Sequence, residues 1–252
     1  MDDLEHPLAG GNVTEGVVRV GETVRRPATA ATPAIEAYLE HLHRAGFSSA
    51  PRTLGRDEQG RQVLEYIPGK SFHTLPPMTH LDLTQLGKLI RQLHDASESF
   101  VPPANAHWNV AIGPNREDLI CHNDLAPWNL IRGDDNRWIF IDWDGAGPGS
   151  RLWDLAYAAA AFLPLEPRGL PTRDNSRLRA LADGYQLTRE QREQLPQLLV
   201  DRTRSMYNLL LEGHHTNRQP WARLYAEGHA SHWGPATDYI ERNLEVWKKS
   251  LL

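Results

Sequence analysis

Cysteine, long apolar segments and excess positive charge are all scarce in this sequence of 252 residues. The single cysteine, Cys121, excludes an internal disulfide, favours a reducing cytoplasm and, inside an apolar run, is expected to be a buried core residue. No run approaches 18 uncharged apolar residues, so we predict no membrane span and no membrane partner. The N-terminus is acidic at Asp2 and Asp3, where a signal peptide would be basic. A formal net charge of −5 argues against nucleic acid binding, which needs a basic surface.

Residues 10–66 carry mainly strand patterns. Alternating β-branched residues on both sides of a Gly-Glu turn predict a hairpin over residues 16–26. Thr32 followed by proline predicts a helix start with a capping hydroxyl, and Gly46 predicts the end of that helix. A further strand is expected over residues 62–66.

From residue 80 onward the apolar periodicity is mostly helical. Leu86, Leu89, Ile90 and Leu93 share one helix face, and this helix is expected to end near His94. The later helices are expected at about residues 152–162, 175–185, 188–215 and 235–249. A Thr-x-x-Gln pattern at Thr188 predicts a capping box for the longest of them.

The most informative stretch is Cys-His-Asn-Asp-Leu-Ala-Pro-Trp-Asn-Leu-Ile, which starts at Cys121 and is followed by an apolar strand that ends in Asp142. It places Asp124 two residues after His122 and five residues before Asn129. A carboxylate base, an amide oxygen and a second carboxylate can converge on Mg²⁺ and a nucleotide, as in the catalytic loop of protein kinases. The His-Arg-Asp, Asp-Phe-Gly and Ala-Pro-Glu motifs of protein kinases are absent, however.

Residues 119–156 instead resemble the aminoglycoside phosphotransferase and choline kinase superfamily. The likeness rests on HNDLAPWNLI, on FIDWDGAGPGSRLWDLA and on the spacing between them. It implies an α+β, bilobal, protein-kinase-like fold with a small β-rich N-lobe (residues 1–66), a hinge (67–70) and a larger, mainly helical C-lobe (71–252). It also implies Mg²⁺-assisted phosphorylation of a small-molecule hydroxyl by ATP or GTP, and the family suggests antibiotic resistance.

The resemblance assigns roles to the residues of the catalytic loop. Asp124 would orient and deprotonate the acceptor hydroxyl, while Asn129 and Asp142 would ligate Mg²⁺. His122, the other residue assigned to the catalytic centre, is expected to brace the loop by hydrogen bonding rather than to act as an acid or base. Asp154 resembles a structural residue that ties a helix to the loop.

Two further residues are candidates for substrate contact. Asp144 resembles the second acid of choline-kinase-like sites; binding a metal, contacting a cationic substrate and capping a turn all remain open for it. Trp128, within the loop, is a candidate wall of the acceptor pocket. Histidine pairs elsewhere in the chain lack the fuller ligand set of a zinc site, so we expect no metal there.

The N-lobe is expected to bind the nucleotide. Gly11, Asn12 and Val13 belong to a glycine-containing segment that would cover the phosphates, although it lacks the Gly-x-Gly-x-x-Gly spacing. Tyr66 and Ile67, next to a Pro-Gly break, would offer backbone groups to an adenine edge; on its own, such a break would only mark the end of a strand.

One departure from the family concerns lysine, which is absent between Gly16 and Gly69. Related phosphotransferases usually place a lysine there, paired with a helix glutamate and directed at the α- and β-phosphates. Strand alternation favours Arg26 over Arg25 as its replacement. The predicted partner is Glu36, and Glu40 is the fallback. A surface Arg–Glu pair of little energetic consequence is the alternative.

The acceptor stays open among aminoglycosides, other antibiotics, amino sugars and amino alcohols. Residues 175–252 hold eleven Lys and Arg against nine Asp and Glu, so no acidic field for a polycation is evident. Two alternatives from other classes remain: a pseudokinase that binds nucleotide without chemistry, and a metal-dependent hydrolase. The sequence predicts no protein partner.

Overall fold

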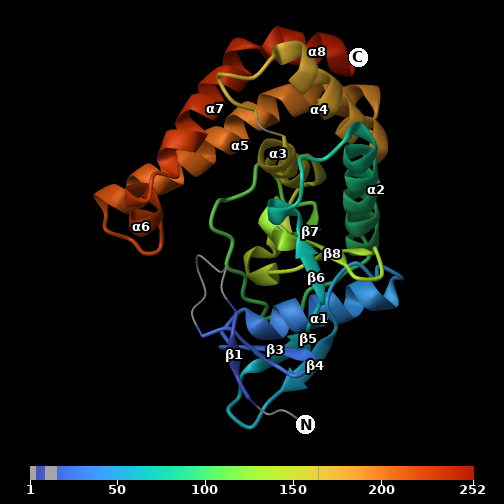
Figure 1. Cartoon of the computed structure of the whole chain (residues 1–252), viewed down its shortest axis with the longest axis vertical. Helices are drawn as coiled ribbons and strands as arrows, with labels where there is room; N and C mark the ends of the chain where they lie inside the picture. Colours follow the sequence, from blue (N-terminus) through green and yellow to red (C-terminus); the bar gives the residue numbers. More distant parts are fainter. Residues whose placement is uncertain (1–3, 9–15, 164) are drawn as a thin grey trace.

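The computed structural model describes residues 4–8, 16–163 and 165–252 (Figure 1). Gly11, Asn12 and Val13, the predicted phosphate segment, lie outside these residues. A β-sheet lobe with one helix forms one end of the molecule, and a larger helical lobe forms the rest. In the described part of the chain, no helix combines the length and the apolar character needed to cross a membrane.

The N-lobe is a five-stranded antiparallel sheet with the order β1-β2-β3-β5-β4. Its strands are β1 (His6–Pro7), β2 (Val18–Val20), β3 (Thr23–Arg26), β4 (Thr53–Arg56) and β5 (Gln62–Glu65). The predicted hairpin is confirmed: Val20 pairs with Thr23 across the turn, where Gly21 has φ +56°. Glycine adopts this left-handed conformation without strain, so the turn can stay two residues long.

Helix α1 (Thr32–Arg44) lies between this sheet and the C-lobe (Figure 1). The prediction that Thr32 caps the helix is wrong. Ala31 is the N-cap residue, and the Thr32 hydroxyl instead accepts a hydrogen bond of 2.8 Å from the Thr29 backbone N–H. The hydroxyl therefore stabilises the turn before the helix rather than the first helical N–H groups. The helix ends at Arg44, shortly before Gly46 with φ +88°.

Two small sheets carry the segments between the lobes. Strand β6 (Gly69–Ser71), which the sequence did not predict, pairs with β8 (Leu130–Gly133), and β8 pairs with β9 (Trp138–Phe140). Gly69 has φ +152°, and a Cβ there would lie 2.2 Å from the backbone oxygen of Arg132. Only glycine allows this close pairing of β6 with β8. The second sheet joins β7 (Leu119–Cys121) and β10 (Gly147–Gly149).

The C-lobe is built of seven helices in the described residues. They are α2 (His80–Ser97), α3 (Arg151–Phe162), α4 (Pro171–Tyr185), α5 (Arg189–His215), α6 (Trp221–Ala226), α7 (Ala230–Arg242) and α8 (Leu244–Leu251). The capping box at Thr188 is confirmed. The single helix expected over residues 235–249 is instead α7 followed by α8, and Pro235 lies inside α7. Figure 1 shows α5 and α7 running side by side toward α6, away from the body of the lobe.

One hydrophobic core extends through both lobes. Tyr38 of α1 is fully buried, packs edge-on against Trp143 and donates a hydrogen bond of 2.9 Å to the backbone oxygen of Ile120 in β7. Within the C-lobe, α2 and α4 cross closely at two glycines, because a Cβ on Gly87 or Gly184 would lie 2.2 or 2.1 Å from a backbone oxygen of the other helix. This packing places β7, and the loop that follows it, against both α1 and α2.

Candidate active site

The loop between β7 and β8 contains the predicted catalytic residues. It passes through Asn123, whose φ of +64° lies in the left-handed region that asparagine tolerates better than most residues. The Asn123 side-chain amide donates to the backbone oxygens of Gly145 and Gly147, at 3.1 and 3.2 Å. The loop is thereby joined to the segment after β9, which carries the second acidic group of the motif.

Asp154 holds the same loop from the other side. Its buried carboxylate accepts hydrogen bonds from the backbone N–H groups of Asn123 (2.9 Å) and His122 (3.3 Å) and from His94 Nε2 (3.1 Å). These donors come from the loop and from α2, while Asp154 itself lies in the first turn of α3. The contacts agree with the predicted role of Asp154 as the residue that ties a helix to the catalytic loop.

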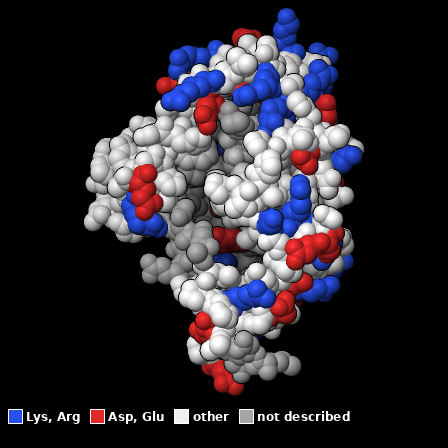
Figure 2. All heavy atoms as spheres, viewed as in Figure 1, with Lys and Arg blue, Asp and Glu red and all other residues white. Residues whose placement is uncertain are grey.

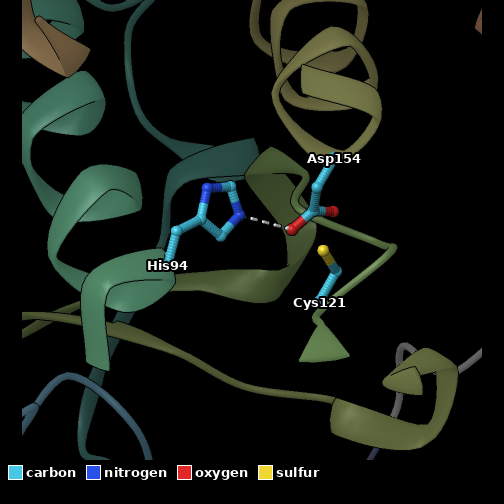
Figure 3. Close-up of side chains that lie close together, drawn as sticks. All are labelled: His94, Cys121 and Asp154. Carbon is cyan, nitrogen blue, oxygen red and sulfur yellow. Dashed lines mark hydrogen bonds and ion pairs between the residues drawn. The ribbon is translucent and has the colours of Figure 1, made fainter. Parts of the chain in front are cut away.

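Cys121 completes a buried group with His94 and Asp154, whose side chains turn toward one another in Figure 3. Their potential ligand atoms lie within 4.8 Å of one another. The hydrogen-bond pattern disfavours a metal here, since Asp154 accepts three hydrogen bonds and His94 Nδ1 also contacts the Tyr185 hydroxyl at 2.8 Å. Burial raises the pKa of the Cys121 thiol well above its usual value, which favours the neutral thiol expected of a core cysteine.

His122 uses both ring nitrogens within the protein. Nδ1 accepts a hydrogen bond from the Asp124 backbone N–H at 3.3 Å, so Nε2 is the donor to the backbone oxygen of Ile141 at 3.1 Å. The ring is fully buried and packs on Trp143, with 4.5 Å between ring centroids. These contacts support the expectation that His122 braces the loop.

The Asp124 carboxylate has a separate partner on each oxygen. Asn129 Nδ2 donates to Oδ2 at 2.7 Å, and the Tyr157 hydroxyl donates to Oδ1 at 2.7 Å. Asn129 Nδ2 also donates to the Asp124 backbone oxygen, at 3.0 Å. Tyr157 belongs to α3. No sequence motif marks it, because an aromatic residue one helical turn after Asp154 carries no catalytic signal.

Asn129 and Asp142 lie on adjacent chain segments. The Ile141 backbone N–H donates to the Asn129 backbone oxygen at 2.9 Å, and Asp142 follows directly with φ +60° and ψ +72°, a strained conformation for a non-glycine residue. Because Asn129 Nδ2 is committed to Asp124, its side-chain oxygen is the group left for a cation. An amide oxygen and partly exposed carboxylates are hard donors that fit Mg²⁺.

Arg26 reaches this site from the N-lobe. Its guanidinium lies 3.4 Å from Asp142 Oδ1 and also pairs with Asp144 Oδ2, and it is largely buried, with 7% of the residue exposed. The two carboxylates are 39% and 33% exposed, and Figure 2 shows acidic side chains on the floor of a hollow in the middle of this face. Asp144 thus faces the same basic group as Asp142.

The predicted ion pair between Arg26 and Glu36 is not formed. Two carboxylates beside one guanidinium attract Arg26 more strongly than the single carboxylate of α1, and Glu36 lies instead 3.5 Å from Arg56 of β4. Arg25 is 3.6 Å from Asp57 on the other face of β3. Of the two arginines, Arg26 is therefore the one that contacts Asp142 and Asp144.

Tyr66 and Ile67 are the residues predicted for the hinge, and Trp128 is the residue predicted for the acceptor pocket. The Tyr66 backbone N–H donates to the Glu22 backbone oxygen at 3.0 Å, so this group of the predicted hinge is already paired within the N-lobe. Ser71 of β6 donates to the Pro127 backbone oxygen at 3.1 Å and so joins the connecting segment to the catalytic loop. Trp128 is 42% exposed, unusual for a tryptophan and consistent with contact to a ligand.

The chain resembles known proteins both in its sequence and in its fold. The chain matches the family described as "Phosphotransferase enzyme family" over residues 104–195, which span the catalytic loop, Asp142, Asp144 and Asp154. A trifolitoxin immunity protein from Rhizobium leguminosarum bv. trifolii is 34% identical over 200 residues, a match that covers 73% of this chain and 75% of that protein.

Solved structures of small-molecule kinases share the fold. A choline/ethanolamine kinase family protein from Mesorhizobium loti has a TM-score of 0.63 at 18% identity, covering 98% of this chain and 92% of that one. A microcompartment-associated aminopropanol kinase has a TM-score of 0.64 at 18% identity, covering 94% and 90%. An amicoumacin kinase in complex with AMP-PNP, Ca²⁺ and amicoumacin has a TM-score of 0.65 at 12% identity, covering 94% and 88%. The predicted bilobal, kinase-like fold is confirmed, and with the sequence match it follows that this chain belongs to the phosphotransferase enzyme family.

Proposed function

We propose that this protein is a kinase that transfers the γ-phosphoryl group of ATP or GTP to a hydroxyl of a small molecule. The observation that carries the proposal is the convergence on Arg26, from the N-lobe, of Asp142 and Asp144 from the C-lobe, next to a catalytic loop in which Asp124 and Asn129 are hydrogen-bonded. A cation from one lobe, opposed by hard oxygen donors from the other, suits a polyphosphate bound between them.

In this mechanism Asp124 orients the acceptor hydroxyl and takes its proton. The hydroxyl oxygen forms the new bond to the γ-phosphorus, the bond from that phosphorus to the β,γ-bridging oxygen breaks, and the nucleoside diphosphate leaves. Because the transition state of phosphoryl transfer is loose, positioning of the hydroxyl matters more than the basicity of the carboxylate. The two hydrogen bonds to Asp124 fix the carboxylate in the orientation that this role needs.

Charge on the phosphates is countered from both lobes. Asn129 and Asp142 would hold Mg²⁺, which when bound neutralises the charge of the phosphoryl oxygens. Arg26 takes the place of the usual lysine, and its planar guanidinium can donate to two phosphate oxygens at once. Asp144 pairs with Arg26 and so keeps the Arg26 side chain within the site.

We assign the acceptor to small hydroxyl compounds that are toxic to the cell. The relative that is 34% identical is named for immunity to trifolitoxin, and one of the structural neighbours is named as an amicoumacin kinase. Phosphorylation adds negative charge and so changes how such a compound is recognised by its target. The reaction uses cytoplasmic nucleotide, and a single buried thiol suits that compartment.

The test measures Mg²⁺-dependent release of ADP or GDP by purified protein with aminoglycosides, other antibiotics, amino sugars, amino alcohols and peptide toxins. We expect at least one acceptor to stimulate release, and Asp124→Asn to lower that rate by at least about 100-fold, as for loss of a positioned base. Asp238→Asn, an exposed carboxylate on α7, is the matched control and should turn over normally. Stimulated release that survives in Asp124→Asn would refute the assigned role of Asp124.

A nucleotide-binding module without catalysis is the second candidate. The observation in its favour is Arg26, which stands where a lysine is usual and pairs with both carboxylates of the site. Nucleotide binding that needs no Mg²⁺, together with no phosphate transfer to any acceptor, would favour this alternative. Mg²⁺-dependent binding with turnover would exclude it.

A further inference from the structure

Tyr157 contacts the catalytic carboxylate directly, yet no motif of the sequence marks it. Its hydroxyl lies 2.7 Å from Asp124 Oδ1, on the opposite side of the carboxylate from the Asn129 amide. Tyr157 follows Asp154 by one helical turn, so the two side chains leave α3 on the same face. Asp154 binds the backbone of the loop, and Tyr157 binds its reactive side chain.

The tyrosine is the donor in this hydrogen bond. Only 3% of Tyr157 is exposed, and burial, with a further contribution from the negative charge of Asp124, raises the pKa of the phenol well above its usual value of 10. The phenol therefore stays protonated over the pH range in which kinases work. A buried, charge-assisted hydrogen bond of this length restrains the carboxylate more strongly than a contact with water would.

The ring of Tyr157 is itself fixed on two sides. Trp233 of α7 stacks on it, with 5.9 Å between the ring centroids and 20° between the planes. The guanidinium of Arg202 from α5 lies 4.3 Å from the ring centroid, at the distance of a cation–π contact. Three helices of the C-lobe thus determine where the phenol hydroxyl points.

Arg202 of α5 is an unusual residue to find buried in the C-lobe. It is 4% exposed and forms no ion pair, and its Nε and Nη1 have no hydrogen-bond partner among the described residues. Nη2 donates to the backbone oxygen of Asn123 at 3.3 Å. Burial lowers the pKa of Arg202, and the negative charges of Asp154 and Asp124 oppose this shift. Burying a cation with so few partners costs desolvation free energy. Arg202 contacts both the catalytic loop and Tyr157, which suggests that it is kept for a role at these two elements.

We propose that Tyr157 and Arg202 are positioning residues, which hold the Asp124 carboxylate in the one orientation that receives the acceptor hydroxyl. This inference rests on the proposed function of Asp124. With Tyr157 on one oxygen and Asn129 on the other, rotation of the carboxylate would break a hydrogen bond on either side. Arg202 fixes the Asn123 carbonyl just before Asp124 and the face of the tyrosine ring.

The decisive variant is Tyr157→Phe, which removes one oxygen and keeps the ring packing. We expect kcat to fall about 10-fold or more, while KM for nucleotide and for acceptor changes less than about 2-fold, because the substrates still bind but the base is no longer held. A KM effect without a kcat effect would overturn the proposal.

Tyr239→Phe is the matched control. Tyr239 is also a buried tyrosine that donates to a buried carboxylate, at 2.8 Å from Asp174 Oδ2, but it joins α7 to α4 and lies outside the catalytic loop. The Tyr239→Phe variant should lose about as much thermal stability as Tyr157→Phe and should keep the kcat of the wild type. Equal kcat values for Tyr157→Phe and Tyr239→Phe would show that Tyr157 acts only in packing.

Arg202→Met tests the second residue, since methionine keeps much of the apolar volume and removes the charge. We expect kcat to fall about 3-fold or more with unchanged KM, in a protein that still unfolds cooperatively. If this variant does not fold, Arg202→Gln, which also removes the charge, replaces it; retention of full kcat in the folded variant would remove Arg202 from the proposal.

A measurement without turnover separates this proposal from the proposed function. In protein labelled with ¹³C at the aspartate carboxyl carbons, the Asp124 resonance is identified by its loss in Asp124→Asn. It should shift in Tyr157→Phe and stay in place in Tyr239→Phe. Absence of turnover in the wild-type protein would count against the kinase, whereas an Asp124 resonance that ignores Tyr157→Phe would overturn the positioning contact itself.

Discussion

The two sides of the candidate site are built in different ways. On the C-lobe side, Asp154, His122 and Asp124 are each held by two or three hydrogen bonds, mostly from buried groups of the same lobe. On the N-lobe side, the described residues contribute Arg26, which is attracted to two carboxylates that are a third or more exposed. Under the proposed function, the loop is held in place by hydrogen bonds before the acceptor binds, whereas the side proposed to bind nucleotide relies on charge.

Rigid and charge-based sites respond differently to mutation. Removing a buried acceptor leaves donors unsatisfied and affects both folding and activity. Removing a charge at a partly exposed pair changes ligand affinity and leaves the fold nearly intact. The comparison can therefore be tested with variants. Those on the C-lobe side should lower both the free energy of unfolding and the activity, whereas those on the N-lobe side should lower ligand affinity alone.

Asp154→Ala should have the largest effect. It leaves the buried N–H groups of His122 and Asn123 and the ring of His94 without their acceptor. We expect the free energy of unfolding to fall by about 3 kcal/mol or more, and the acceptor-stimulated rate to fall by about 100-fold. Urea denaturation followed by circular dichroism measures the first quantity, and ADP release measures the second.

Asp174→Ala is the matched control for Asp154→Ala. Asp174 is equally buried in the C-lobe and accepts from Tyr239 and Arg173, far along the chain from the catalytic loop. It should lose stability and keep its rate per folded molecule. If Asp154→Ala also kept its rate per folded molecule, the loop would not depend on Asp154 for its geometry, and the comparison between the lobes would fail.

The candidate residues on the C-lobe side could be found from the sequence because their signals are local. Asp124, Asn129 and Asp142 lie within 19 residues of the chain, and a hydrophobic strand on each side determines which way they point. Tyr157 and Arg202 could not be found in this way, since their contacts depend on how α3, α5 and α7 pack together. Sequence patterns give the periodicity of a helix but not the identity of its neighbours.

The N-lobe side was predicted less completely for a related reason. Strand alternation separated Arg26 from Arg25, and the structure gives the two arginines different partners because they lie on opposite faces of β3. The partner of Arg26 depends on the distance between the lobes, which strand periodicity does not contain, and Glu36 was therefore the wrong choice. The two-residue hairpin turn was found because its glycine signal is local.

Arg26→Gln should have the second-largest effect, on nucleotide binding. It removes the N-lobe cation at Asp142 and Asp144 while keeping a polar side chain of similar reach. We expect Kd for the Mg²⁺-nucleotide complex to rise about 10-fold, equivalent to loss of one charge-assisted contact, with little change in the free energy of unfolding. Isothermal titration calorimetry measures the affinity.

Arg25→Gln is the control that the chain provides for Arg26→Gln, since it removes the adjacent charge on the same strand but on the other face. Arg25 pairs with Asp57 at 3.6 Å, away from the site. Its nucleotide affinity should remain that of the wild type. Equal losses in both variants would mean that overall charge of the N-lobe, and not the contact made by Arg26, determines binding.

Glu36→Gln should have the smallest effect, and it decides between the two pairings of Arg26. In this structure Glu36 lies 3.5 Å from Arg56, a pair whose arginine is 41% exposed, so its loss should change the free energy of unfolding by no more than about 1 kcal/mol. Nucleotide affinity should change less than about 2-fold, because the described contacts of Glu36 lie outside the site. If calorimetry instead shows a loss as large as that of Arg26→Gln, then Glu36 takes over Arg26 when nucleotide binds. In that case Asp142 and Asp144 hold Arg26 only in the absence of nucleotide, and the charge-based side of the site changes partners during each catalytic cycle.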